Sequence, residues 1–345
     1  MTMPAPNLRI QVGQGGPSEP DLLPAIVPGR SNPLKGASSG RWADAVFRAA
    51  LLLAALSVLM VVALIITQLV QQSKLSMHQF GWKFFTTGNW DPVNGDFGAT
   101  PFIFGTLVSS FLALLIAVPL GVGAAIFMTE MCPRPLRNIF SYLVELLAAI
   151  PSVIYGLWGI FILVPIMRAY IQPFFAKNFG WTGLFSGPMY GIGMLPASMI
   201  LAIMIVPFIS SITREVMLAV PQSQREAVLA LGATRWEMLR IGVLRNARIG
   251  IMGGIVLALG RALGETMAVT MLIGNRPEIA KSLFAPGYTM ASVIANEFSE
   301  ATENLYLSAL VEIGLALFLV TIVVNIIAQA LIWSITRGSS TRAHA

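Results

Sequence analysis

The stretch Ala49–Val70, AALLLAALSVLMVVALIITQLV, contains no charged side chain. A second stretch, Ile103–Met128, reads IFGTLVSSFLALLIAVPLGVGAAIFM and is also uncharged. Each reaches the about 20 residues that an α-helix needs to cross the hydrocarbon core of a bilayer. Neither shows the two-residue alternation of a membrane β-strand, which excludes a β-barrel. The two stretches therefore predict membrane-spanning helices.

Four further apolar segments extend this pattern along the chain. Pro151 lies near the middle of the third span, where it removes one backbone hydrogen bond, so we expect a kink or a break there. Only helices satisfy every backbone polar group in lipid once a barrel is excluded. The fold class is an all-α polytopic membrane protein with six transmembrane helices. The predicted spans are Ala49–Val70, Ile103–Met128, Ile139–Met167, Gly191–Ile212, Ile249–Gly274 and Leu305–Ile335.

The overall composition supports a membrane protein and excludes several other classes. Of 345 residues, 56% are hydrophobic and 11% are charged, whereas a soluble globular domain has about 25% charged residues. This excludes a soluble enzyme and a disordered regulator. A disulfide-built secreted domain is excluded because Cys132 is the only cysteine. The net charge of +6 is read as a sign of membrane topology rather than of nucleic-acid binding.

The distribution of Lys and Arg predicts the orientation and the domain boundaries. Most of these side chains lie before the first span, in the second-to-third and fourth-to-fifth connections, and at the C-terminus. By the positive-inside rule these segments, and both termini, are cytoplasmic. Residues 1–42 are rich in Pro and Gly and are expected to form a mobile cytoplasmic tail. The transmembrane domain would cover residues 43–336, and residues 337–345 would form a cytoplasmic C-terminal tail.

The connection 221–248 predicts two short helices joined at a glycine. Ser223-Gln224-Arg225-Glu226 has the form of a capping box at a helix start, and Thr234-Arg235-Trp236-Glu237 repeats it. Between them Gly232 offers a left-handed helix stop. The second helix would carry an apolar face that includes Trp236, Leu239 and Val243.

This connection can be interpreted in two ways. An amphipathic helix pair can lie on the membrane surface. Alternatively, the pair is a docking element for a cytoplasmic partner, because Ala227 and Gly232 leave little bulk at the bend and let another protein approach the backbone.

Arg261 and Glu265 form a charged pair inside the predicted fifth span. Four residues apart on a helix, they would share one face. An arginine at the bilayer centre is costly, so the pair should face the bundle interior or a water-filled path. One interpretation is a packing ion pair. The other is a weak anion site, because a guanidinium can bind two oxygens of an oxyanion at once.

The sequence contains no motif for chemistry within this chain. There is no Gly-x-x-x-x-Gly-Lys-Ser/Thr run for holding ATP. The two histidines, His78 and His344, are far apart, so neither a metal site nor a catalytic residue is predicted. No cofactor is expected.

Several motifs resemble those of a known family. Glu226-Ala227-Val228 followed by Gly232 is similar to the EAA loop of ATP-binding-cassette importer permeases. Two departures are the valine at 228 in place of alanine and Arg245 where many members have proline. Segments 144–159 and 260–270 resemble the phosphate permeases, and Trp90-Asp91-Pro92 with Phe97-Gly98 resembles their PstC-type branch. The likeness covers roughly residues 50–335.

The resemblance implies a type I ABC importer permease bundle that carries inorganic phosphate through the lipid membrane. Its implied partners are a PstA-type permease, a PstB-type ATPase dimer that binds the 221–248 loop, and a PstS-type phosphate-binding protein; nucleic acid is not among them. It also implies that Arg261 and Glu265 matter for transport. A permease for sulfate or molybdate remains an alternative. An ion-coupled secondary transporter would be favoured by paired broken helices, of which the sequence shows only the one at Pro151.

The segment after the first span is rich in aromatic side chains on the predicted outer side. It carries Phe80, Trp82, Phe84, Phe85, Trp90 and Phe97. Such residues commonly form an aromatic belt at the membrane interface. Docking of the extracytoplasmic binding protein is the alternative interpretation.

Overall fold

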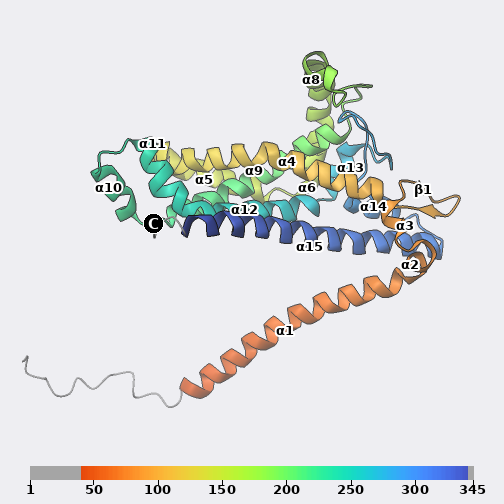
Figure 1. Cartoon of the computed structure of the whole chain (residues 1–345), viewed down its shortest axis with the longest axis horizontal. Coiled ribbons are helices and arrows are strands. Elements are labelled where there is room, and N and C mark those ends of the chain that lie inside the picture. The colour runs from red at the N-terminus through yellow and green to blue at the C-terminus, as the bar shows by residue number, and fades with distance from the viewer. Residues whose placement is uncertain (1–39, 341–345) are drawn as a thin grey trace, which may run out of the picture. The chain divides into compact units, whose positions relative to one another are not determined.

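The computed structural model describes residues 40–340, most of which are helical (Figure 1). They fall into two compact units, one ending at Val61 and the other beginning at Val62. The predicted N-terminal tail, residues 1–42, lies outside the described residues except where α1 (Gly40–Gln72) begins. At the other end, α15 (Asn304–Ser340) remains helical beyond residue 337, and residues 341–345 lie outside the described part.

Six helices of the described chain are long and apolar enough to cross a membrane, which confirms the predicted number of spans. Four of them contain the predicted segments or overlap most of their length, while the third and fifth differ. The spans are Trp42–Gln72, Thr100–Met131, Ser152–Thr182, Met194–Leu218, Arg235–Leu263 and Asn304–Ser334.

The chain breaks at Pro151, as the sequence predicts. α5 (Arg134–Ala149) ends there and α6 (Ser152–Trp158) begins, because Pro151 has an extended ψ of 141° and lacks an N–H. The predicted boundaries of the third span, 139–167, are wrong. The helical run after the break continues through Gly159–Leu163, α7 (Val164–Ile166), Met167–Ile171, α8 (Gln172–Phe179) and the 3₁₀ turn Gly180–Thr182.

The predicted fifth span is not one helix. α12 (Arg245–Leu263) ends before Gly264, and α13 (Met267–Ile273) begins after Thr266. Glycine is a poor helix former. The Glu265 side chain accepts a hydrogen bond from the Ala268 N–H in α13, so Glu265 lies between two helices and not within a continuous one. The prediction of a continuous helix over 249–274 is therefore wrong.

α4 (Thr100–Ile126) and α9 (Met194–Leu218) form the centre of the second unit, and they run side by side in Figure 1. Small α4 residues such as Ala113 and Ala117 are fully buried against large aliphatic residues of α9. Gly121 packs so closely that a Cβ atom there would lie 2.8 Å from Ile209 Cγ2. α4 continues as a π-helical segment, Phe127–Met131. Close packing over this length makes the two helices one body.

Short elements cover one end of the bundle. α2 (Lys74–Phe80), α3 (Lys83–Thr86) and α14 (Met290–Glu297) surround an antiparallel hairpin of β1 (Trp90–Asp91) and β2 (Asp96–Phe97).

The hairpin end has an aromatic core. Phe84, Trp90 and Phe97 are buried there, so the prediction of an interfacial belt is wrong for these three residues, whereas Trp82 is 87% exposed. The Glu297 carboxylate fixes the hairpin by accepting hydrogen bonds from Trp90 Nε1 at 2.8 Å and from the Tyr306 hydroxyl at 2.7 Å.

Candidate functional site

Two groups of residues are candidates for function, and the first surrounds α10 (Gln222–Ala230) at the opposite end of the bundle from the hairpin (Figure 1). The helix begins after Pro221, whose missing N–H and fixed φ suit a helix start. No side chain caps this start, so the predicted Ser223 capping box is wrong. Gly232 has φ of +83° and ends the turn, as predicted.

The second predicted capping box is present. The Thr234 hydroxyl accepts a hydrogen bond from the Glu237 N–H at 3.3 Å, and the Glu237 carboxylate accepts from the Thr234 N–H at 2.8 Å. This box begins α11 (Arg235–Glu237), which continues as the π-helical segment Met238–Leu244 into α12. The helix–glycine–helix prediction is thereby confirmed.

The outer face of this element is accessible. Glu226 and Ala227 of α10 are exposed, as is Gly232, where an added Cβ would meet nothing within 4 Å. Of the predicted apolar face, Leu239 and Val243 are buried, whereas Trp236 is 64% exposed. Leu231 is 88% exposed. Charged and apolar groups thus share one open surface around the glycine corner.

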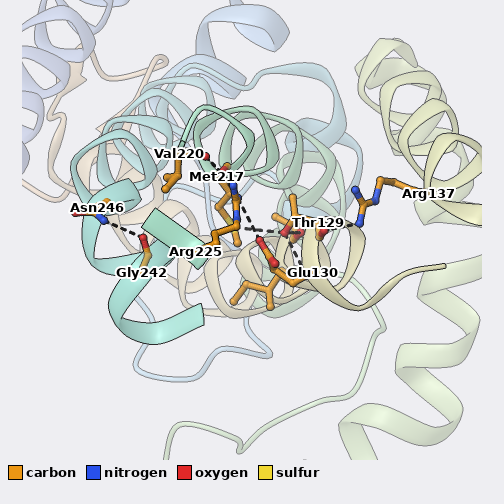
Figure 2. Close-up of polar contacts among 10 residues, drawn as sticks. Thr129, Glu130, Arg137, Met217, Val220, Arg225, Gly242 and Asn246 are labelled. Atoms are coloured by element: carbon orange, nitrogen blue, oxygen red, sulfur yellow. Dashed lines mark hydrogen bonds and ion pairs between the residues drawn. The ribbon is translucent and has the colours of Figure 1, made fainter. Parts of the chain in front are cut away.

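Arg225 connects the inner face of α10 to two long helices (Figure 2). Its guanidinium donates to the Met217 carbonyl in the last turn of α9 at 2.8 Å, and to the Val220 carbonyl just after that helix at 2.6 Å. It also pairs with Glu130 Oε1 at 3.3 Å, in the π-helical extension of α4. Carbonyl oxygens at the C-terminal end of a helix favour a cation. Arg225 therefore binds α10 to the α4–α9 body.

A separate contact connects α10 to α12. Asn246 Nδ2 donates to Gln224 Oε1 at 2.7 Å and to the Gly242 carbonyl at 2.8 Å (Figure 2 draws the second bond). Arg137, at the start of α5, donates to the Thr129 carbonyl at 2.6 Å and so braces the end of α4.

The sequence interpretation did not identify Arg225 and Glu130 as partners. They are 95 positions apart, so no local spacing indicates that they pair. The only signal was their position beside segments that the sequence had already singled out. Arg225 directly precedes Glu226-Ala227-Val228, and Glu130 follows the second predicted span, which ends at Met128.

The second group lies around Arg261, near the end of α12. Its guanidinium carbon lies 5.6 Å from the centre of the Phe208 ring on α9, within the range of a cation–π contact. Glu265 lies beyond the helix end, so the predicted single helical face for the two residues is wrong. In the described part of the chain no ion pair joins Arg261 to Glu265. The Glu265 carboxylate instead accepts from the Ala268 N–H at 3.3 Å.

Two chain breaks flank this group. α6 and α13, which begin after the breaks at Pro151 and at Gly264–Thr266, pack against each other. An added Cβ on Gly156 would lie 3.3 Å from the Ala268 Cα. The hydroxyl of Tyr155 crosses the first break to donate to the Leu147 carbonyl at 2.7 Å. The sequence showed one broken span without a matching partner, and the structure adds the second.

Two further carboxylates lie outside both groups. Glu145 of α5, which ends before the third span begins, pairs with Arg214 of α9 at 3.2 Å. Glu312 of α15 is 1% exposed. Among the residues that the structure describes, no group of three His, Cys, Asp or Glu could hold a metal ion.

Comparison with known proteins was made against families, curated sequences and solved structures. The family model described as "Binding-protein-dependent transport system inner membrane component" matches residues 117–337. A phosphate transport system permease protein PstC from Mesorhizobium japonicum is 48% identical over 91% of this chain and 97% of that protein. PstC 2 from Mycobacterium tuberculosis is 38% identical over 91% of this chain and 97% of its own length.

One solved structure supports the fold. A bacterial ABC transporter involved in the import of the acidic polysaccharide alginate covers 86% of this chain and 99% of its own, with a TM-score of 0.58. Its sequence identity of 18% restricts the likeness to architecture.

Proposed function

This chain belongs to the binding-protein-dependent transport permeases, and from that premise we propose that it is the permease subunit of an ATP-driven importer that carries inorganic phosphate across the cytoplasmic membrane. The observation that carries the proposal is the 48% identity to a PstC permease over nearly the whole chain. In this proposal the accessible helix–glycine–helix element binds the ATPase, and the intramembrane guanidinium of Arg261 binds the anion.

The importer requires partner subunits. Because the sequence has no ATP-binding loop, ATP hydrolysis is assigned to a PstB-type ATPase dimer. A PstA-type permease would complete the passage, and a PstS-type protein would deliver phosphate. The α10 end is assigned to the cytoplasm because the connections that hold it are rich in arginine. Residues 43–336 form the membrane domain of this proposal, with cytoplasmic tails at 1–42 and 337–345.

Coupling would begin at the exposed face of α10. Glu226, Ala227 and Gly232 meet the ATPase, where the absence of bulk at the glycine corner lets the partner approach closely. Closure of the ATPase dimer moves α10, and Arg225 passes this movement to the α4–α9 body through its bonds to Met217 and Glu130. The bundle then changes between inward-facing and outward-facing states.

Phosphate would pass close to Arg261, whose planar donors can bind two oxygens of the anion. We expect the site to be weak, because Glu265, four residues from Arg261 in the sequence, adds a negative charge that competes with the anion. Glu265, held at the start of α13, can accept a hydrogen bond from a protonated phosphate oxygen, which sulfate does not carry at neutral pH.

The test is reconstitution of the complete complex in liposomes with ATP inside and the binding protein outside. Labelled phosphate should accumulate only with ATP, and sulfate and molybdate should not compete. Arg261→Gln should remove uptake while leaving assembly unchanged on size-exclusion chromatography. Equal uptake of sulfate or molybdate would replace phosphate with a broader oxyanion class. ATP-independent uptake driven by an ion gradient would overturn the proposal.

A further inference from the structure

Neighbouring residues of α10 connect to different helices. Gln224 accepts a hydrogen bond from Asn246 at the start of α12, at 2.7 Å. Arg225 donates to the Met217 carbonyl at the end of α9, at 2.8 Å. A movement of α10 is therefore delivered to α9 and α12 through separate bonds.

The same two helices meet again deep in the bundle. Arg261 is close to the far end of α12, and Phe208 lies near the middle of α9, with the guanidinium 5.6 Å from the ring centre. At 1.5 Å of rise per residue, Arg261 is about 22 Å along the helix from Asn246, and Phe208 is about 14 Å from Met217. A movement of α10 that slides α9 slightly against α12 therefore changes the distance between Arg261 and Phe208.

The chemistry of this contact suits a reversible one. Arg261 has no carboxylate partner among the ion pairs of the described residues, and Glu265 is occupied with the Ala268 N–H. A cation over an aromatic face is attracted by the ring quadrupole without forming a hydrogen bond. The guanidinium therefore keeps its donors available for an oxyanion.

The backbone around Phe208 is also adapted to movement. Pro207 precedes it inside α9 and removes one intrahelical hydrogen bond. Phe208 is partly buried, in the cluster that contains the α4 and α9 contacts.

We propose that Phe208 is a positioning residue that holds Arg261 in the transport path between cycles. Sliding of α9 against α12, started at Arg225 and Gln224, moves the guanidinium away from the ring so that it binds an inorganic oxyanion. This inference rests on the proposed function and adds to it the residue that holds the Arg261 guanidinium in position. Without the ring, Arg261 turns toward Glu265 and pairs with it, which blocks the anion.

The decisive experiment changes the ring's electrostatics and leaves its shape almost unchanged. Phe208 is replaced by mono-, di- and trifluorophenylalanine in the full reconstituted complex, since each fluorine weakens the attraction for a cation. Phosphate uptake should fall stepwise, reaching about a three- to tenfold loss with the trifluoro ring. The same series at Phe284, which is buried in the same cluster, is the matched control and should show no trend. A flat series at Phe208 overturns the inference.

Two substitutions separate this inference from the function on which it depends. Phe208→Trp retains a cation-binding face and should keep more uptake than Phe208→Leu, whereas a purely steric role predicts the reverse order because tryptophan is larger. Arg261→Gln measures the site itself. If Arg261→Gln abolishes uptake but Phe208→Leu does not change it, only the role of Phe208 fails. If Arg261→Gln transports normally, the proposed anion site fails.

Discussion

Arg225 of α10 and Glu130 in the π-helical extension of α4 form an ion pair of 3.3 Å, with side chains that are 13% and 16% exposed. Because the same guanidinium also bonds to the end of α9, one side chain joins three helices. A charge left without its partner at such low exposure carries a large desolvation cost. This pair is therefore better suited to force transmission than an exposed surface pair, which contributes little.

Arg225→Ala should separate ATP hydrolysis from transport. Loss of the guanidinium removes the partner of Glu130 and a donor to the Val220 and Met217 carbonyls, at about 1.5–3 kcal/mol for a hydrogen bond to a charged group. We expect uptake to fall at least tenfold while ATPase activity persists, measured together in liposomes. Arg240→Ala is the control, because Arg240 is an exposed arginine of the same connection.

Glu130→Ala extends this test through a double-mutant cycle. Because both residues serve one contact, the double variant should lose little more than Arg225→Ala alone. Additive losses in uptake would show that the ion pair does not transmit the movement of α10.

Gly232→Ala should weaken coupling through the backbone. The residue has φ of +83°, which costs a non-glycine residue about 1–2 kcal/mol. An added Cβ meets nothing within the chain, so the structure leaves room for the methyl group. We expect reduced ATPase affinity for the permease, measured by co-purification. Gly253→Ala is the matched control because it lies in open space inside α12. Unchanged co-purification of Gly232→Ala would contradict docking at this corner.

The sequence predicted the helices better than it predicted their interruptions. Apolar runs determine that a segment spans a membrane, and six spans were predicted and found. The break after Arg261 escaped prediction because glycine inside an apolar run also occurs in continuous membrane helices. Only the tertiary environment, in which Glu265 bonds to the Ala268 N–H, shows that α12 ends at Leu263.

The same limit applied to the proposed functional residues. Gly232 and the Thr234 capping box are local features, and both were predicted from adjacent residues. Phe208 and Glu130 contact partners on other helices, so periodicity and spacing cannot identify them. The Ser223 capping box was predicted wrongly because Pro221, two residues earlier, begins the helix first.

Glu297→Ala should loosen the hairpin end of the bundle. Its carboxylate accepts from Trp90 Nε1 and from the Tyr306 hydroxyl, and Trp90 is 7% exposed, so both donors would be left unpaired. We expect a loss of about 2–4 kcal/mol of unfolding free energy. Glu297→Gln keeps an acceptor oxygen and should lose less. The measurement is the thermal unfolding midpoint in detergent; equal midpoints for Glu297→Ala and the unmodified protein would contradict a structural role for these bonds.

Gly121→Ala and Gly123→Ala test the close packing of α4 against α9 with two neighbouring glycines of one helix. At Gly121 the new methyl group would lie 2.8 Å from Ile209 Cγ2 and 3.2 Å from the Val206 carbonyl oxygen, so the helices must separate. Such overpacking costs about 1–3 kcal/mol, which exceeds the gain in helix propensity. At Gly123 nothing lies within 4 Å, and alanine should stabilise the helix by up to about 1 kcal/mol. Opposite shifts of the thermal unfolding midpoint are therefore expected.

In the uptake assay, Gly121→Ala should also slow transport, because separating α4 from α9 divides the body that Arg225 moves. Midpoints that shift in the same direction for both variants would contradict the close approach of the two helices at Gly121.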